Sequence, residues 1–460
     1  TSLWELTASG SLDQIQSNYL ISPGMAARDA AGSLWIADGR NGLVSNVSGE
    51  LLPYIPNGPI TDQVFRLKYV NDKLYAVPGG FTSNAEPLNR TGFLSSFHNG
   101  SWSSVQTTVN DITDVDYLNG HLFIASFGDG IEVMNAASEK TVRVIDEQGA
   151  DLMTLDPLDS DVRMAALEVS GGSVWVCNVG SPLLRYDPVP DSWAAFSSAP
   201  FTYDLLADSE GNFWMPVFHN YGGGIDVADP NTNLNTTLTF NNGLPDNLVQ
   251  SIDVDREGVV WVGTKEGVAY FFSSDEPALR PIFENRFLLQ NENITAIKTD
   301  GGNRKWIGTE RGVWLFNPTG EELIYNFTVE NSPLISNHIV SIEVHPKTGE
   351  VFFATDKGIV SYRSDATAWD VTFGMLKIFP NPVRSDFAGV VGISGLATDA
   401  EVKITDVSGK LIWQTHSQGG TATWNVRDYN GRRAARGVYL VFAATENGGE
   451  SMVGKIAVVD

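Results

Sequence analysis

Four arginines near the C-terminus are the side chains best suited to hold a charged ligand. Arg427, Arg432, Arg433 and Arg436 lie within ten residues of one another, around a predicted hairpin turn. A guanidinium donates two parallel hydrogen bonds to a phosphate or a carboxylate. The pattern therefore predicts a site for an anionic ligand on this hairpin. The alternative interpretation is a solvated turn that balances the acidic remainder of the chain.

The other residues that could do chemistry form no catalytic or metal-binding pattern. The six histidines show no metal-ligand spacing, and no Gly-x-Ser-x-Gly elbow occurs. The segment 253–258 resembles the start of a calcium loop, but Thr264 stands where the bidentate Glu is required, six residues after Gly258. We therefore expect a turn between strands there, and we expect no enzyme activity, no metal and no cofactor.

Two further features carry weaker signals. Cys177 is the single cysteine of the chain and lies in an apolar, strand-like run, so we expect a small buried core residue. The loop 219–224, His-Asn-Tyr-Gly-Gly-Gly, interrupts an otherwise regular pattern of strands. Such a loop either lines a ligand-binding face or is merely a long connection.

The net charge is −25, and it is distributed unevenly along the chain. From residue 376 onward there are nine Lys and Arg against eight Asp and Glu, whereas residues 1–375 hold 21 basic and 47 acidic side chains. A polyanion of this kind repels nucleic acids and anionic membrane surfaces, so nucleic-acid binding is excluded. The change of charge balance marks a boundary between two domains.

An internal repeat predicts the strands and turns on which the candidate residues lie. A turn with Gly or Asn, a strand that holds an aromatic residue, a second turn and another strand recur along the chain, most clearly at 255–270, 305–316 and 349–362. The aromatic anchors, 39 to 52 residues apart, are Trp35, Tyr75, Phe123, Trp175, Trp214, Trp261, Trp306 and Phe352. This period is typical of four-stranded propeller blades.

The repeat has a physical explanation. An aromatic ring at a fixed place in each inner strand can wedge between adjacent blades and bury about 150–250 Å². Asp six residues before the aromatic, as in Asp255 and Trp261, can accept hydrogen bonds from its own backbone and hold the turn. Eight copies predict one ring of seven or eight blades, with the segment near Met25–Arg28 as the outer strand of the final blade.

After residue 373 the pattern changes to that of a small antiparallel sandwich. Alternating apolar residues are separated by Asp-x-x-Gly and Asn-Gly turns, for example at 406–409 and 430–431. We therefore predict an all-β protein with a propeller over residues 1–373 and a C-terminal Ig-like β-sandwich over residues 374–460.

The motifs of both parts resemble known families. The ending Trp-x-Gly-Thr followed by Gly-Val, at 261–268 and 306–313, resembles the two-component regulator propeller repeat. The tail is similar to the type A C-terminal sorting domain of the type IX secretion system, through Pro-Asn-Pro at 380–382, Asp-x-x-Gly-Lys at 406–410 and Gly-Val-Tyr-Leu-Val at 437–441. Together they resemble the PorZ family of Bacteroidetes.

This resemblance implies a non-enzymatic protein at the cell surface, on the outer face of the outer membrane. It implies a component of the type IX attachment complex that acts with a PorU-type sortase, PorV and PorQ, and that helps to deliver anionic lipopolysaccharide to the sortase. Anionic lipopolysaccharide would then be the ligand of the four arginines, and no transmembrane segment is expected.

Two alternatives remain open. The first is a secreted cargo propeller, either a glycan-binding protein or a glycan-active enzyme, which its tail would export. The second is the periplasmic sensor domain of a hybrid two-component system. That class requires a transmembrane helix after the propeller, where this chain has a sorting-type tail.

Overall fold

The protein is described by a computed structural model that covers residues 3–6, 9–54, 57–148, 152–155, 161–368, 372–445 and 451–460. The helices in these ranges are two single-turn 3-10 helices, η1 (His219–Tyr221) and η2 (Phe240–Asn242), and the rest of the regular structure is β-strand. The chain divides into two compact units, residues 1–59 with 99–103 and residues 60–98 with 104–460.

The smaller unit contains a hairpin and one antiparallel sheet. The hairpin is formed by β1 (Leu3–Leu6) and β2 (Leu12–Ile15), and the sheet by β3 (Pro23–Arg28), β4 (Leu34–Asp38), β5 (Gly42–Ser45) and β6 (Leu52–Pro53). Its buried core is small and consists of Leu34, Ile36 and Val44. Met25–Arg28 was expected in the outer strand of the final blade, but it belongs to β3 and pairs with β4.

The larger unit begins with seven consecutive groups of antiparallel strands, and the second and third groups share one sheet through the pairing of Phe127 with Arg163 and of Gly128 with Val162. Their strands are β7 (Arg66–Val70), β8 (Lys73–Val77), β9 (Phe93–His98) and β10 (Ser101–Gln106); β11 (Ile112–Leu118), β12 (His121–Gly128), β13 (Gly130–Asn135) and β14 (Lys140–Ile145); β15 (Val162–Ser170), β16 (Ser173–Asn178), β17 (Leu183–Asp187) and β18 (Ser192–Phe196); β19 (Leu206–Ala207), β20 (Phe213–Pro216), β21 (Ile225–Asp229) and β22 (Leu234–Leu238); β23 (Val249–Val254), β24 (Val260–Thr264) and β25 (Gly267–Phe271); β28 (Ile294–Thr299), β29 (Lys305–Thr309), β30 (Gly312–Phe316) and β31 (Leu323–Phe327); and β32 (Ile339–Val344), β33 (Glu350–Thr355) and β34 (Gly358–Arg363). A two-residue hairpin, β26 (Ile282–Phe283) and β27 (Arg286–Phe287), follows the fifth sheet.

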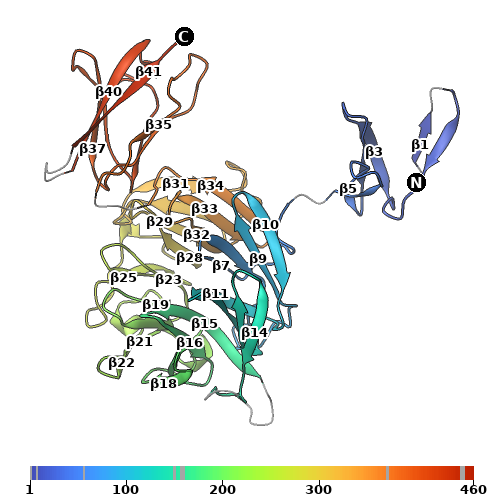
Figure 1. Cartoon of the computed structure of the whole chain (residues 1–460). Coiled ribbons are helices and arrows are strands. Elements are labelled where there is room, and N and C mark those ends of the chain that lie inside the picture. The colour runs from blue at the N-terminus through green and yellow to red at the C-terminus, as the bar shows by residue number, and fades with distance from the viewer. Residues whose placement is uncertain are drawn as a thin grey trace. The chain divides into compact units, whose positions relative to one another are not determined.

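These sheets close into a ring. Figure 1 shows them side by side around a centre, where β7, β11, β23 and β28 lie. The first strand of each sheet contacts the first strand of the next, and the last sheet meets the first where the backbone N–H of Leu67 in β7 donates to Ser341 Oγ in β32, at 3.0 Å. The described part of the chain therefore forms a seven-bladed propeller, as predicted.

The repeated aromatic residues lie on the second strand of each blade, next to the innermost strand. Those of the seven blades are at most 6% exposed. Trp175 packs against Phe213 of the next blade with ring centroids 4.2 Å apart. The second strand suits them because its side chains lie between the faces of two blades, whereas the innermost strand lines the central channel. The wedge between blades is confirmed.

The Trp-x-Gly-Thr ending is explained by close packing between blades. A Cβ atom on Gly263 would lie 2.5 Å from Ile294 Cγ2, and one on Gly308 would lie 2.7 Å from Ile339 Cγ2. Only glycine lets the innermost strand of the next blade approach this closely. Thr264 Oγ1 then donates to the carbonyl of Gly267 at 2.9 Å and ties the following turn.

The C-terminal part is a sandwich of two antiparallel sheets. One sheet has the order β35 (Lys377–Phe379), β36 (Val391–Ser394) and β39 (Thr421–Trp424); the other has the order β38 (Leu411–His416), β37 (Glu401–Asp406), β40 (Gly437–Ala444) and β41 (Ser451–Val458). Their inner faces enclose a core of their own around Trp424, Ile404 and Val441. The fold class is therefore all-β, a propeller followed by an Ig-like sandwich.

The structure divides the chain into more parts than the sequence predicted. A propeller over residues 1–373 does not separate residues 1–59, which the structure places in the smaller unit. The first aromatic copy, with Trp35 on β4, accordingly forms a sheet of the smaller unit, and the other seven copies form the ring.

Candidate functional site

The four arginines lie on an exposed hairpin between β39 and β40. Asp428 holds the turn, because its Oδ1 accepts the backbone N–H groups of Asn430 and Arg432, each at 2.9 Å. Across the turn, the backbones of Arg427 and Arg433 form an antiparallel bridge. The structure thus brings these two arginines together.

Three of the four guanidinium groups form hydrogen bonds or an ion pair with other groups of the protein. Arg427 Nη1 donates to the carbonyl of Gly431 at 2.7 Å. Arg433 donates through Nη1 and Nη2 to the carbonyls of Phe387 and Arg384, each at 2.9 Å. Arg436 Nη1 pairs with the side-chain carboxylate of Asp460 at 2.6 Å.

Arg432 differs from the other three arginines. Its side chain is exposed, and within the described ranges its guanidinium has no hydrogen bond or ion pair. An anion at this hairpin would meet one unengaged guanidinium and three that already hold backbone or carboxylate oxygens. The anion site therefore stays a prediction, and Arg432 is the residue on which it depends.

A second candidate, absent from the sequence-based prediction, is the centre of the ring. A cavity of about 590 Å³ lies between the innermost strands, and β7, β23, β28 and β32 contribute most of its wall. Such a volume is in the range of small-molecule sites, about 300–1,000 Å³. Its charged lining residues are Arg66, Lys68, Glu168, Asp204, Asp253, Lys298 and Glu343, and its other titratable lining residues are Tyr203, His219 and His338.

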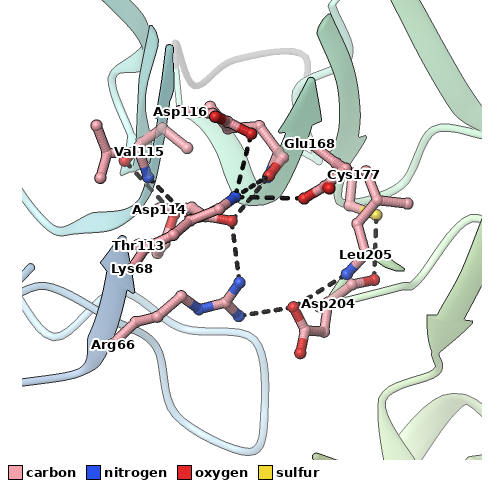
Figure 2. Close-up of polar contacts among 12 residues, drawn as sticks. Arg66, Lys68, Thr113, Asp114, Val115, Asp116, Glu168, Cys177, Asp204 and Leu205 are labelled. Atoms are coloured by element: carbon pink, nitrogen blue, oxygen red, sulfur yellow. Dashed lines mark hydrogen bonds and ion pairs between the residues drawn. The ribbon is translucent and has the colours of Figure 1, made fainter. Parts of the chain in front are cut away.

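Figure 2 shows the charged network on one side of this cavity. Arg66 pairs with Asp114 at 2.9 Å and with Asp204 at 2.8 Å. The ammonium group of Lys68 lies 3.3 Å from Asp114, 3.5 Å from Asp116 and 3.4 Å from Glu168, and it donates to the carbonyl of Leu167 at 2.9 Å. Two cations thus hold four carboxylates of three neighbouring blades.

Across the cavity, Lys298 is held less tightly. Its ammonium group lies 3.8 Å from Asp253 and 3.4 Å from Glu343. The side chain of Lys298 is 32% exposed, whereas those of Asp253 and Glu343 are 10% and 9% exposed. In this half of the network, one lysine is shared by two carboxylates, and each carboxylate also accepts one backbone N–H, that of Thr299 for Asp253 and that of Val344 for Glu343.

Several of the polar side chains have a structural task. Asp114 Oδ2 accepts the backbone N–H of Leu167 at 3.1 Å, and Asp253 Oδ2 accepts that of Thr299 at 2.6 Å. The innermost strand of a blade has one edge without a strand partner, so its N–H groups need other acceptors. Carboxylates of the preceding blade supply them, which explains why charged residues lie inside the ring.

Burial sets the electrostatics of the cluster. It raises the pKa of Glu168, Asp253 and Glu343 above the ordinary values, because each carboxylate is removed from water. For Lys68, burial alone would lower the pKa, but Asp114, Asp116 and Glu168 outweigh it and raise the pKa. The lysine therefore stays charged, while the three carboxylates are the groups most easily protonated.

Cys177 lies beside this network and is buried, as expected. Its Sγ donates to the carbonyl of Asp204 at 3.5 Å. Burial raises the pKa of its thiol to about 12, so the thiolate needed for nucleophilic chemistry does not form near neutral pH.

The loop flagged in the sequence lies at the mouth of the cavity. His219 lines the cavity within η1, and Tyr221 stacks on Phe201 with ring centroids 3.8 Å apart. Asn220 donates to Asn84 at 2.7 Å, which ties the loop to the first blade. Of the two interpretations, the loop that lines a cavity is the one that the geometry supports.

Sequence reasoning missed the charged channel, although a signal was present. Arg66 and Lys68 are two residues apart, as are Asp114 and Asp116, so each pair shares one face of a strand. Charged residues with this spacing in the first strand of a blade indicate a polar channel lining. The prediction from sequence instead rested on the strand that holds the repeated aromatic residue, which is the second strand of a blade.

Within the described ranges, no group of three or more His, Cys, Asp and Glu side chains is arranged to hold a metal ion. The helices of these ranges are too short to cross a bilayer.

Comparisons with known proteins can be set beside this geometry. Residues 377–459 match the family described as the secretion system C-terminal sorting domain, and residues 243–266 match the two component regulator propeller. No curated protein matches the chain.

Among solved structures, one covers the whole chain with a TM-score of 0.69. It is PorZ, described as an essential bacterial surface component of the type-IX secretion system of Porphyromonas gingivalis, and the match spans 100% of this chain and 68% of PorZ at 23% identity. The chain has a PorZ-like fold.

A second structure resembles the chain less closely. The extracellular domain of the hybrid two component system BT4673 from B. thetaiotaomicron matches 100% of this chain and 72% of its own length, at 14% identity and a TM-score of 0.51. This likeness concerns the fold alone.

Proposed function

We propose that this chain is a non-enzymatic component of the type IX secretion system, held on the outer face of the outer membrane. The observation that carries the proposal is the combination of a closed propeller and a C-terminal sorting domain in one chain, over which PorZ matches from end to end. A scaffold of this kind needs no nucleophile or metal. The thiol beside the central cavity is protonated and buried, which agrees with that role.

The first experiment is the intact mass of the protein recovered from its native cell surface. A resident component of the secretion machinery keeps its tail, so we expect a mass that includes residues 376–460. A chain cut near residue 370 would overturn the proposal. It would instead make the protein a secreted cargo, either a glycan-binding protein or a glycan-active enzyme, with its activity in the propeller.

We further propose that the chain acts with a PorU-type sortase, PorV and PorQ, and that it helps to deliver anionic lipopolysaccharide to the sortase. Support comes from the resemblance to the PorZ family and from the exposed, unengaged guanidinium of Arg432. The near-neutral tail is also the part of this acidic chain that an anionic glycolipid can approach with least repulsion.

Replacement of Arg432 by Ser tests the lipopolysaccharide proposal. Purified full-length variants are passed over immobilised anionic lipopolysaccharide, and Arg436→Ser serves as the control because it removes the same charge from a side chain already paired with Asp460. We expect Arg432→Ser to weaken retention several-fold and Arg436→Ser to weaken it less. Equal retention of both variants and the wild type would contradict this site without bearing on the fate of the tail.

A further inference from the structure

The central cavity of the ring is built to admit a small molecule at one end. Its wall comes from the innermost strands, and its mouth is formed by aromatic side chains that precede or follow those strands. Phe81 packs edge-on against Phe65, with ring centroids 5.1 Å apart, and Tyr203 lies beside the same cluster. Phe65, Phe81 and Tyr203 all line the cavity and are only partly buried.

β-bulges direct additional side chains into the cavity. The pairing of β23, β28 and β32 with their neighbours shifts at one residue near the start of each strand, and those residues are Gln250, Thr295 and Val340. A bulge turns a side chain away from the regular alternation. All three residues line the cavity, and the buried Oγ1 of Thr295 has no hydrogen-bond partner in the described structure. A buried hydroxyl without a partner is unfavourable unless a ligand or water supplies one.

The charge balance of the cavity specifies the ligand. Three cations, Arg66, Lys68 and Lys298, face or pair with six carboxylates, Asp114, Asp116, Glu168, Asp204, Asp253 and Glu343. Negative charge is therefore in excess. At Asp253 and Glu343, a single counterion, Lys298, serves two carboxylates at 3.8 and 3.4 Å.

A positively charged ligand would be attracted both by the carboxylates and by the aromatic rings of this cavity. Two carboxylates that share one lysine can attract a further ammonium group in a site shielded from water. The faces of aromatic rings at the mouth also attract cations. An anionic ligand would meet the excess carboxylates, and a purely apolar ligand would leave the Thr295 hydroxyl without a partner.

We propose that the central cavity binds a small molecule carrying an ammonium group, with Asp253 and Glu343 as its counterions and Thr295 as a hydrogen-bond partner. The site lies in the ring and does not rest on the proposed secretory role. Its failure in the following experiment would leave the fate of the tail as an independent question.

Titration calorimetry on the full chain with matched probes tests the proposal. Tyramine is compared with tyrosol, which has a hydroxyl in place of the ammonium, and glucosamine is compared with glucose. We expect each ammonium probe to bind at least about tenfold more tightly than its neutral partner, the effect of one charge-assisted hydrogen bond. Equal affinities within both pairs, or binding by none of the four, would overturn it.

Two variants locate the site. Glu343→Gln removes a counterion and is expected to weaken tyramine binding about tenfold. Thr295→Val removes a hydroxyl that has no partner in the protein, so it should weaken binding while the melting temperature stays at or above that of the wild type. Glu276→Gln, an exposed residue of the fifth blade, is the charge-matched control. Unchanged affinity in both cavity variants would contradict the assignment.

Proton release gives a second readout. A bound ammonium favours the ionised forms of Asp253, Glu343 and the nearby Glu168, whose pKa values burial has raised, so binding should expel protons when these groups are partly protonated. Arg66, Lys68 and Lys298 face the same groups and stay charged. The binding heat at about pH 5 should then depend on the ionisation enthalpy of the buffer. A buffer-independent heat would count against counterions in this cavity.

Discussion

At the scale of residues, one pair of side chains couples the turn of a blade to its packing. The carboxylate of Asp255 accepts the backbone N–H groups of Glu257 and Val259, each at 3.0 Å, and also the indole N–H of Trp261 at 2.9 Å. The same indole contact occurs in the pairs Asp29 and Trp35, Asp208 and Trp214, and Asp300 and Trp306. In each of these copies, the aspartate that forms the turn therefore also orients the repeated tryptophan.

The copy of the repeat that contains Asp255 is accompanied by an additional charged residue. Lys305 of the next blade is fully buried, pairs with Asp255 at 3.1 Å and lies 4.9 Å from the ring centroid of Trp261. Burial lowers the pKa of Lys305, which indicates that its charge depends on this partner. A buried ion pair is costly to break from one side only, because the remaining charge is uncompensated.

We expect Asp255→Ala to lower the free energy of unfolding by about 3–5 kcal/mol, the usual loss for one member of a buried pair. The double variant Asp255→Ala, Lys305→Met should recover part of this loss, since the uncompensated ammonium is removed. Urea unfolding of both variants measures the effect. If the double variant is no more stable than Asp255→Ala, the buried charge is not the cause.

At the scale of elements, the innermost strands bind their neighbours through side chains. Asp114 and Asp116 of β11 accept N–H groups of β15, and Ser251 and Asp253 of β23 accept N–H groups of β28. The ring closes in the same way between the last and first blades, through Ser341. In the part of the chain that the structure describes, no strand of the first blade pairs with a strand of the last, so bonds that involve side chains, such as that of Ser341, join these two blades.

A histidine lies at this closure. His345, after β32, contacts the hydroxyl of Tyr69 in β7 through Nε2 at 3.1 Å. Its Nδ1 accepts the backbone N–H groups of Lys347 and Thr348 at 3.1 and 3.3 Å. The proton of the neutral ring is therefore on Nε2 and is donated to Tyr69. Protonation of Nδ1 would place a proton against two N–H donors.

The closure should weaken in acid. Burial lowers the pKa of His345 below its ordinary value of 6.5, so the unfolded chain binds the proton more readily than the folded one. Its contribution is complete above pH 6.5 and is lost as the pH falls toward the folded pKa. We expect the melting temperature to fall less between about pH 7.5 and about pH 5.5 in His345→Gln than in the wild type.

The comparison with His345→Gln is needed because Glu168, Asp253 and Glu343 act in the opposite direction. Their raised pKa values make the folded protein relatively more stable in acid. Parallel pH profiles for the variant and the wild type would show that His345 does not control the closure.

At the scale of the molecule, the propeller and the sandwich are stabilised by separate cores. The core around Trp424 and Val441 consists of residues after 372, and the cores between blades consist of residues of the ring. Trp424 is fully buried and donates its indole N–H to the carbonyl of Arg427 at 2.9 Å. It therefore also supports the arginine hairpin.

Trp424→Ala should destabilise the sandwich by about 3–5 kcal/mol through the cavity that it leaves, while the ring keeps its stability. Hydrogen exchange resolved by peptide is the measurement. We expect faster exchange in β36, β37 and β40 and unchanged exchange in β24 and β29. Equal acceleration in both parts would show that they unfold as one cooperative unit.

The amino-acid sequence alone determined the class of architecture, because the signals involved are local. The period of the aromatic residues, the Asp before Trp261 and the turns of the tail each lie within a few residues of one another. The propeller, the sandwich and the wedge role of the aromatics could therefore be predicted. Which strand of a blade faces the channel could not be predicted, since periodicity does not distinguish the strands of a blade.

Only the tertiary structure decided which side chains meet. Arg433 is engaged by the carbonyls of Arg384 and Phe387, almost fifty residues away, so its availability to a ligand could not be judged from the hairpin. Lys298 and Glu343 come from different blades and meet because these two blades are neighbours in the ring. Contacts of this kind depend on which strands become neighbours in the folded ring. The sequence of one repeat does not specify which side chains of the adjacent blades it will contact.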